Sequence, residues 1–326
     1  SAQDLNLKNF RFHFDGNSNG SREDSSAKRG KMFDAGHFSL GRIMLDAQDF
    51  YYSSDTIRVS VSKFTAIDQN NFVIKQFETD FLMDRNSMTA KNLNIKTAGS
   101  SVAADLKIGY SSRRALKDSL ASLNITADMK DLSIRNSDIV YFIPKLSQNA
   151  FFLNGTIIST LSGTIKGRID SLKGKDIVLT TATGTLVKTD FGVTGLSDIR
   201  TAFWSLPNLE LRTGRQDAEM IAGKFIPAKI DLPENIKAEI AFAGRLKSFE
   251  SVISLASSYG SAKINASVDE DENFEGKATI EEFNLGRLLQ DTAMFGPVTL
   301  TAEARGHGFD KASFNARINA DVSRIR

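Results

Sequence analysis

The residues that could do chemistry in this chain are few, and their spacing does not assemble a catalytic site. Residues 16–20 read Gly-Asn-Ser-Asn-Gly and match the spelling of a nucleophile elbow, which presents a serine at a strained turn between a strand and a helix. A polar stretch follows in place of a helix, so the match does not predict a nucleophile. Ser60 and Lys63 form a Ser-x-x-Lys pattern on the polar side of a strand, where a solvated strand face is the better interpretation.

Residues that could ligate a metal are equally scattered. The three histidines are His13, His37 and His307, and none has a second ligand at helical spacing, although a site that gathers them in space stays open. Residues 269–273 (Asp-Glu-Asp-Glu-Asn) resemble the start of a calcium loop, but Phe274 and Ile280 stand where such a loop needs glycine and glutamate. We therefore expect a hairpin turn at 269–273, no catalytic residue, no metal, no cofactor and no enzymatic activity.

Composition excludes several further classes of function. The chain has 326 residues, with 41 Lys and Arg against 39 Asp and Glu, so its net charge of +2 argues against nucleic acid as a partner. The absence of cysteine excludes disulfides and thiolate metal sites. The sequence contains no run of about 18 apolar residues, the length that crosses a bilayer as a helix. Because the chain begins Ser-Ala, without Met or a signal-like apolar core, we expect a segment of a longer protein.

The elements that must position any site are strands with one apolar face. Five runs alternate apolar or small residues with polar ones, which is typical of antiparallel sheet with one dry and one wet face. The runs are 236–244, 262–268, 274–280, 298–306 and 312–322. Earlier parts of the chain show the same alternation, and a phase shift near Lys8 or Asn9 predicts a bulge. A flexible loop is expected at 15–31. Short helices are expected at 114–123, 136–148, 215–222 and 285–291.

About fifteen strands with little helix must still hide their dry face. An open twisted sheet rarely exceeds about ten strands without curling, splitting or closing. We expect a mainly β protein with an elongated, curled antiparallel sheet (a β-taco, or repeating β-groove) and a few short helices; stacked sandwiches are the alternative. The expected portions of this one continuous unit are 1–135, 136–228 and 229–326. Three segments read as copies of a strand, a glycine-centred turn and a strand, which favours a stack of repeats. They are 163–179, 238–255 and 301–318.

The dry face of such a sheet is the candidate site. It carries many Ala and Gly residues, which either leave room for a ligand or interdigitate with large residues opposite. Because each CH2 group exposed to water costs about 0.8 kcal/mol, a dry groove would let a lipid move without any catalytic residue. The candidate residues lining the groove are Ile240, Phe242, Ile264, Val268, Ile280, Val298, Leu300, Phe314 and Ile318.

Several local phrases resemble the TamB branch of the AsmA-like proteins of Gram-negative bacteria. The strongest are 280–289 (IEEFNLGRLL) and 295–309 (FGPVTLTAEARGHGF). Further ones are 46–61 (DAQDFYYSSDTIRVSV), 131–144 (DLSIRNSDIVYFIP), 163–179 and 206–212. The resemblance implies a repeating β-groove protein of the periplasm, anchored in the inner membrane, that takes part in phospholipid transport and outer-membrane biogenesis.

The resemblance also implies a second reading of the chain. In that reading the chain is a scaffold or chaperone for outer-membrane protein assembly with a TamA-type barrel partner, offering a strand edge to its clients. The membrane helix and the C-terminal region typical of the family have no counterpart among these residues, so anchoring and barrel docking are assigned to none of them. The family has no catalytic set to transfer.

Overall fold

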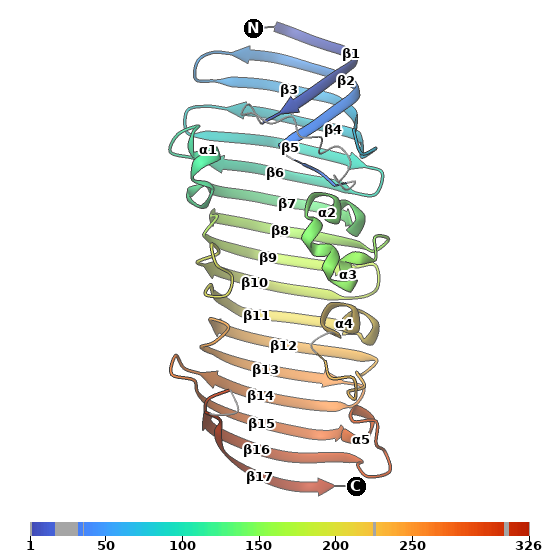
Figure 1. Ribbon diagram of the computed structural model, residues 1–326, viewed down its shortest axis with the longest axis vertical. Helices are drawn as coiled ribbons and strands as arrows, with labels where there is room; N and C mark the ends of the chain where they lie inside the picture. The colour runs from blue at the N-terminus through green and yellow to red at the C-terminus, as the bar shows by residue number, and fades with distance from the viewer. Residues whose placement is uncertain (1, 17–31, 35, 224–225, 310–312, 326) are drawn as a thin grey trace, which may run out of the picture. The chain divides into compact units, whose positions relative to one another are not determined.

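The protein is mainly β, as the alternation predicts. The computed structural model describes residues 2–16, 32–34, 36–223, 226–309 and 313–325 (Figure 1). It has 63% strand and 12% helix, and its strands form an antiparallel sheet that is not closed. Two compact units, residues 1–166 (unit 1) and 167–326 (unit 2), are described separately. The predicted portions 1–135, 136–228 and 229–326 stay predictions.

Unit 1 is an antiparallel meander in which each strand pairs with the next one along the chain. Its strands are β1 (Ala2–Asp15), β2 (His37–Tyr52), β3 (Ile57–Asp68), β4 (Val73–Met83), β5 (Ser87–Thr97), β6 (Ser101–Gly109) and β7 (Asn124–Arg135). The predicted bulge is confirmed, because the register between β1 and β2 shifts between Lys8 and Phe10 and Asn9 has a φ of 55°. The predicted loop falls at 17–31, outside the described residues, and Asp15 ends β1.

Unit 2 follows the same rule from β9 to β17. Its strands are β9 (Ser171–Thr181), β10 (Leu186–Thr194), β11 (Phe203–Gly214), β12 (Asn235–Gly244), β13 (Phe249–Ser257), β14 (Gly260–Val268), β15 (Asn273–Asn284), β16 (Pro297–His307) and β17 (Asn315–Ile325). The strand β8 (Ile158–Arg168) contains the boundary between the units. The five predicted runs fall on β12 and β14 to β17, although β17 begins only at Asn315.

Sequence periodicity missed β13 as a run of its own. On this strand Ser251 and Ser257 share the side that carries Ile253 and Leu255, while Val252 lies on the opposite, polar side and is 44% exposed. The alternation is therefore inverted at both kinds of position. The only sequence signal for β13 is the repeat at 238–255, which predicts a second strand after the turn that follows Gly244.

The short helices occur where their signals predict them. They are α1 (Ala115–Asp118) with the 3₁₀ turn η1 (Leu120–Ser122), α2 (Asn136–Phe142) with η2 (Pro144–Gln148), α4 (Arg215–Ala222) and α5 (Leu285–Leu288). Pro144 interrupts the second segment, as its missing N–H and its restriction on the preceding residue require. An unpredicted helix, α3 (Ala150–Leu153), is capped by Asn149, whose side chain accepts a hydrogen bond from Phe151 N.

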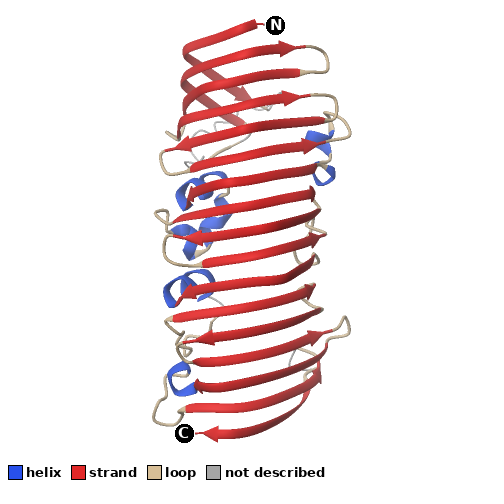
Figure 2. Cartoon of the chain, turned by 180° about the vertical axis from the view of Figure 1, so that it is seen from behind, coloured by secondary structure: helices blue, strands red, loops and turns tan. Residues whose placement is uncertain are grey.

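The helices lie at the margins of the strands. In unit 1, α2 and α3 stand at one margin and α1 at the other, and in unit 2, α4 and α5 share a margin (Figures 1 and 2). In chain order α2 follows β7, α4 follows β11 and α5 follows β15, so from β7 onward a helix follows every fourth strand. The described helices are all short, and none is long and apolar enough to cross a bilayer.

Candidate functional site

The candidate site of unit 2 is the face of the sheet that carries Ile240, which we call the apolar face. Strand pairing sets its side chains in rows that run across the strands, because residues opposite one another in a ladder point to the same side. One row is Ile240, Ile253, Ile264, Ala278, Ala302 and Ala320. The next is Ala238, Leu255, Ala262, Ile280, Leu300 and Val322. Six strands thus present one continuous apolar surface.

The predicted lining residues are largely brought together by this register. Eight of the nine lie on the apolar face of β12 and β14 to β17, and Ile280 stands directly opposite Leu300. Val298 is only 4% exposed and is covered by its neighbours, whereas Ile318 on β17 is 67% exposed. Phe314 lies just before β17, where its ring is 6.1 Å from that of Phe274. Sequence reasoning missed Phe249, Ile253 and Leu255, which β13 contributes to the same face.

Two further rows, nearer the end of β12 that carries Gly244, include small residues. Phe242, Ser251, Ala266, Gly276, Ala304 and Ile318 form one, and Gly244, Phe249, Val268, Phe274, Gly306 and Ala316 form the other. From Ala266 to Ala304 the first of these rows has almost no side-chain volume, while the aromatic rings of Phe242 and Phe249 stack 5.4 Å apart beside it. Large and small side chains therefore alternate over the face.

The opposite face of unit 2 is charged and wet. Ion pairs join neighbouring strands, with Lys277 Nζ 2.8 Å from Glu303 Oε1 and an Arg305 nitrogen 2.6 Å from Glu275 Oε1. The Lys277 ammonium lowers the pKa of Glu303, chiefly through its hydrogen bond. All four side chains are exposed, so solvent screens these pairs and they add little to stability. The charges define which face stays in water.

Within the described part of unit 2, no second sheet packs on the apolar face. Each strand makes most of its contacts with its ladder neighbours, and the short α4 and α5 lie against β11 and β16. Residues such as Ile240 and Ile264 are half-buried. A face that is apolar, continuous and without a covering layer has the character of a binding surface.

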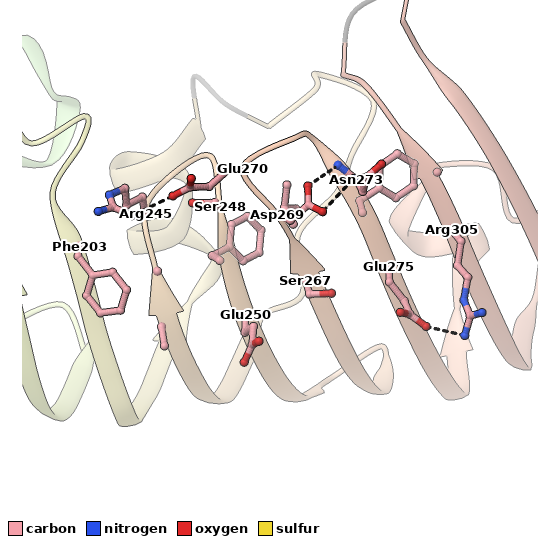
Figure 3. Close-up of a pocket in the computed structure, with 16 residues that line it drawn as sticks. Phe203, Arg245, Ser248, Glu250, Ser267, Asp269, Glu270, Asn273, Glu275 and Arg305 are labelled. Atoms are coloured by element: carbon pink, nitrogen blue, oxygen red, sulfur yellow. Dashed lines mark hydrogen bonds and ion pairs between the residues drawn. The ribbon is translucent and has the colours of Figure 1, made fainter.

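A cavity of about 770 Å³ lies at one end of the strands β12 to β16 (Figure 3). Its lining includes Phe249, Val268 and Phe274 from the apolar face together with Glu275 and Arg305 from the opposite face, and the strands around it bend along their length. Polar groups mark its rim, where Arg245 lies 3.5 Å from Glu270. Asp269 Oδ1 accepts hydrogen bonds from the backbone N–H groups of Asp271 and Asn273, which confirms the predicted hairpin turn between β14 and β15.

Hydrogen bonds hold the pKa of Asp269 below its ordinary value, first among them the one from the Asn273 side chain. The carboxylate is therefore ionised at neutral pH. The turn stands at the rim of the cavity, so one wall of the apolar end carries a fixed negative charge (Figure 3).

Unit 1 builds an apolar face by the same means. One row crosses all seven of its strands through Leu7, Leu45, Phe64, Phe77, Ile95, Val102 and Leu132. At one end of the strands, aromatic rings from different elements meet. Phe38 of β2 contacts Phe12, Phe14 and Phe33, and Phe33 lies 5.3 Å from Phe142 of α2 between ring centroids. The apolar surface thus continues from the strands onto a helix.

In the part of the chain that the structure describes, the serine, lysine and histidine residues considered above as catalytic or metal-binding candidates are not assembled into a site. Ser60 donates a hydrogen bond to Asp80 Oδ1 at 2.9 Å, and Lys63 lies on the exposed side of β3. His37 lies 3.2 Å from both Asp15 and Asp34, while His307 contacts Asn273. Among the described residues, no three His, Asp or Glu side chains are grouped as metal ligands would be. Residues 17–20 of the elbow-like pattern lie outside the described residues.

Comparisons with protein-family models, with curated proteins and with solved structures find no match to this chain. The apolar faces therefore carry the functional argument by themselves.

Proposed function

We propose that this chain is a segment of a periplasmic protein that bridges the inner and outer membranes and shelters phospholipid acyl chains on its apolar faces. The observation that carries the proposal is the set of rows through Ile240 and Ile280 on the apolar face of unit 2, which no second layer of described residues covers. Acyl chains are the matching occupant because each CH2 group buried there is worth about 0.8 kcal/mol.

The geometry suits a chain lying along the face. A strand of nine residues is about 30 Å long, and neighbouring strands lie about 4.8 Å apart, so a face of six strands is large enough for acyl chains. The polar headgroup would stay in water at the rim. The local phrases at 131–144 and 280–289 that resemble the TamB branch support the periplasmic setting and the transport role.

The test pairs an inward variant with an outward one on the same strand. Phe242→Asp places a charge on the apolar face, whereas Ala241→Asp places it on the opposite face of β12, across from Val252. Binding of a phospholipid with a photoactivatable acyl chain should fall at least tenfold in the first variant and remain in the second. Equal labelling of both variants would overturn the proposal.

A second variant separates lost binding from lost folding. Ala302→Trp adds apolar bulk without charge to the row through Ile264, so it should block labelling while far-UV circular dichroism stays unchanged. Retained labelling in a folded Ala302→Trp protein would contradict the assignment of the acyl site to this row.

A scaffold or chaperone for outer-membrane protein assembly with a TamA-type barrel is the second candidate. The observation that favours it is the strand β17, whose described ladder is the one with β16. On this strand Ile318 is 67% exposed and Val322 is 43% exposed. Such an edge offers backbone N–H and C=O groups to an added strand. Crosslinking of an extended client peptide to Asn319, together with lipid-free apolar faces, would favour this function over the first.

A further inference from the structure

We propose that the helical corner of unit 1, formed by α2, η2 and α3, docks on the surface of a lipid bilayer. The inference goes beyond the sheltering of acyl chains, since it assigns a membrane contact to a separate surface. Its core is three large apolar side chains that each leave about half or more of their surface exposed, although the ring of Phe142 also contacts Phe33 and Phe72. Phe142 is 51% exposed, Ile143 52% and Leu153 69%.

The corner is held rigidly from beneath. Asn136 is fully buried, and its side-chain amide donates to the carbonyl oxygens of Phe151 at 2.7 Å and Asn154 at 3.3 Å, which ties α2 to α3. The buried Tyr141 stacks on Phe72 with ring centroids 4.6 Å apart. The exposed apolar side chains are therefore presented by an ordered support.

The corner also has a hollow suited to apolar insertion. A cavity of about 290 Å³ lies between the helices, lined by Val140, Tyr141, Phe152 and Leu153 among others. The wall is mainly apolar, so water inside it gains few hydrogen bonds. A lipid tail or the side chains of the corner itself can fill this space when the surface is pressed against hydrocarbon.

The charge of the corner selects a bilayer over an ordinary protein surface. Residues 139–154 contain no Asp or Glu and a single cation, Lys145, next to the exposed Ile143 and Pro144. The acid before this stretch, Asp138, accepts hydrogen bonds from Thr97 and Ser100 in the β5–β6 turn and is thereby directed at the sheet. Aromatic and aliphatic side chains with a nearby lysine and no acid suit the interface of a membrane that contains anionic lipid.

The whole chain should therefore sediment with vesicles of phosphatidylethanolamine and phosphatidylglycerol. The double variant Phe142→Ser, Ile143→Ser should lower the partition coefficient about tenfold or more, because it removes two large apolar contacts with the bilayer. The matched control is Leu120→Ser, which alters a residue that is 55% exposed in η1 at the other margin of unit 1. That control should partition like the unaltered chain.

Two further measurements identify the contact. The tryptophan of a Phe142→Trp variant should be quenched by lipids brominated on their acyl chains, whereas a Leu120→Trp variant should show no quenching beyond that of the native Trp204. Lys145→Glu should weaken binding to anionic vesicles more than to vesicles of phosphatidylcholine. Equal partition of the double variant and the control into vesicles would overturn the proposal. A double variant that loses self-association but binds vesicles like the unaltered chain would overturn it as well. Neither result affects acyl labelling at Phe242, so the two proposals fail separately.

Discussion

Asp217 Oδ2 accepts a hydrogen bond of 2.5 Å from Thr185 Oγ1, although the two residues are 32 positions apart. Asp217 is the third residue of α4, and Thr185 follows the turn between β9 and β10. The same carboxylate oxygen accepts from Thr181 and Thr183. In unit 1, Asp138 is likewise the third residue of α2 and accepts from Thr97 and Ser100 of the β5–β6 turn. A helix acid thus fastens the preceding hairpin in both units.

Removing this acceptor should destabilise unit 2. Asp217 is 2% exposed, so Asp217→Ala removes the buried acceptor that Thr181, Thr183 and Thr185 share, and we expect a loss of about 2 kcal/mol in the free energy of unfolding. Urea denaturation followed by circular dichroism measures the loss. Glu219→Ala on the exposed side of the same helix is the control and should change the value by less than about 0.5 kcal/mol. Equal losses in the two variants would contradict the fastening role.

The same carboxylate should make stability depend on acid pH. Burial raises the pKa of Asp217, but the hydrogen bonds from Thr185, Thr183 and Thr181 outweigh it, and the net pKa lies below the ordinary value of 3.8. A folded-state pKa below the unfolded one gives stability that is present above about pH 4 and is lost as pH falls through the folded value. The urea concentration at the midpoint of unfolding should decrease as the pH is lowered below about 4. This decrease should be less steep in the Asp217→Asn variant. Parallel pH curves would refute this assignment.

The glycine-centred turns should tolerate no side chain. Gly244 has a φ of 142°, and a Cβ there would lie 2.4 Å from the Ser248 carbonyl oxygen. Gly244→Ala should therefore cost more than about 2 kcal/mol, since backbone strain and a backbone clash add. Gly223→Ala is the control, because Gly223 has helical backbone angles and a Cβ there meets nothing within 4 Å. Comparable melting temperatures for the two variants would show that the turn can relax.

Phe72 should hold α2 in place. Its ring stacks on Tyr141 and lies edge-on to Phe142 at 5.3 Å, so Phe72→Ala should cost about 2 kcal/mol and loosen the helix. Hydrogen exchange is the direct measurement, because the Phe33 N–H donates to the Tyr141 carbonyl at 3.0 Å and should lose its protection. Unchanged exchange at Phe33 would place the support of α2 elsewhere.

The repeat suggested by the sequence is present as strand pairs. The segments 163–179, 238–255 and 301–318 each contain a strand, a turn and a second strand, namely β8 and β9, β12 and β13, and β16 and β17. In each, a Cβ on the glycine before the turn would strike a carbonyl oxygen after it, at 2.3 Å for Gly167, 2.4 Å for Gly244 and 2.3 Å for Gly306. The glycines are thus required by close approach of the backbone.

The sequence by itself determined most of the strands with their two faces, and all of the short helices except α3. Strict alternation from Ile236 to Phe242 leaves one energetically acceptable orientation, since a slip of one residue would expose the apolar set and bury the charges. Eight of the nine predicted lining residues therefore lie on the apolar face. The bulge at Asn9 and the helix break at Pro144 were also predictable from the sequence, because both depend on local backbone chemistry.

Only the tertiary structure decided which residues from separate strands share a row. The strand β13 joins the face through pairing with β12 and β14, in spite of Ser251 and Val252, because ladder hydrogen bonds outweigh its weak alternation. The partnership of Asp217 with Thr185 and the exposure of Phe142 depend likewise on where distant segments meet. Periodicity along one strand carries no information about such encounters, which is why the apolar face was predictable and the fastening acids and the helical corner were not.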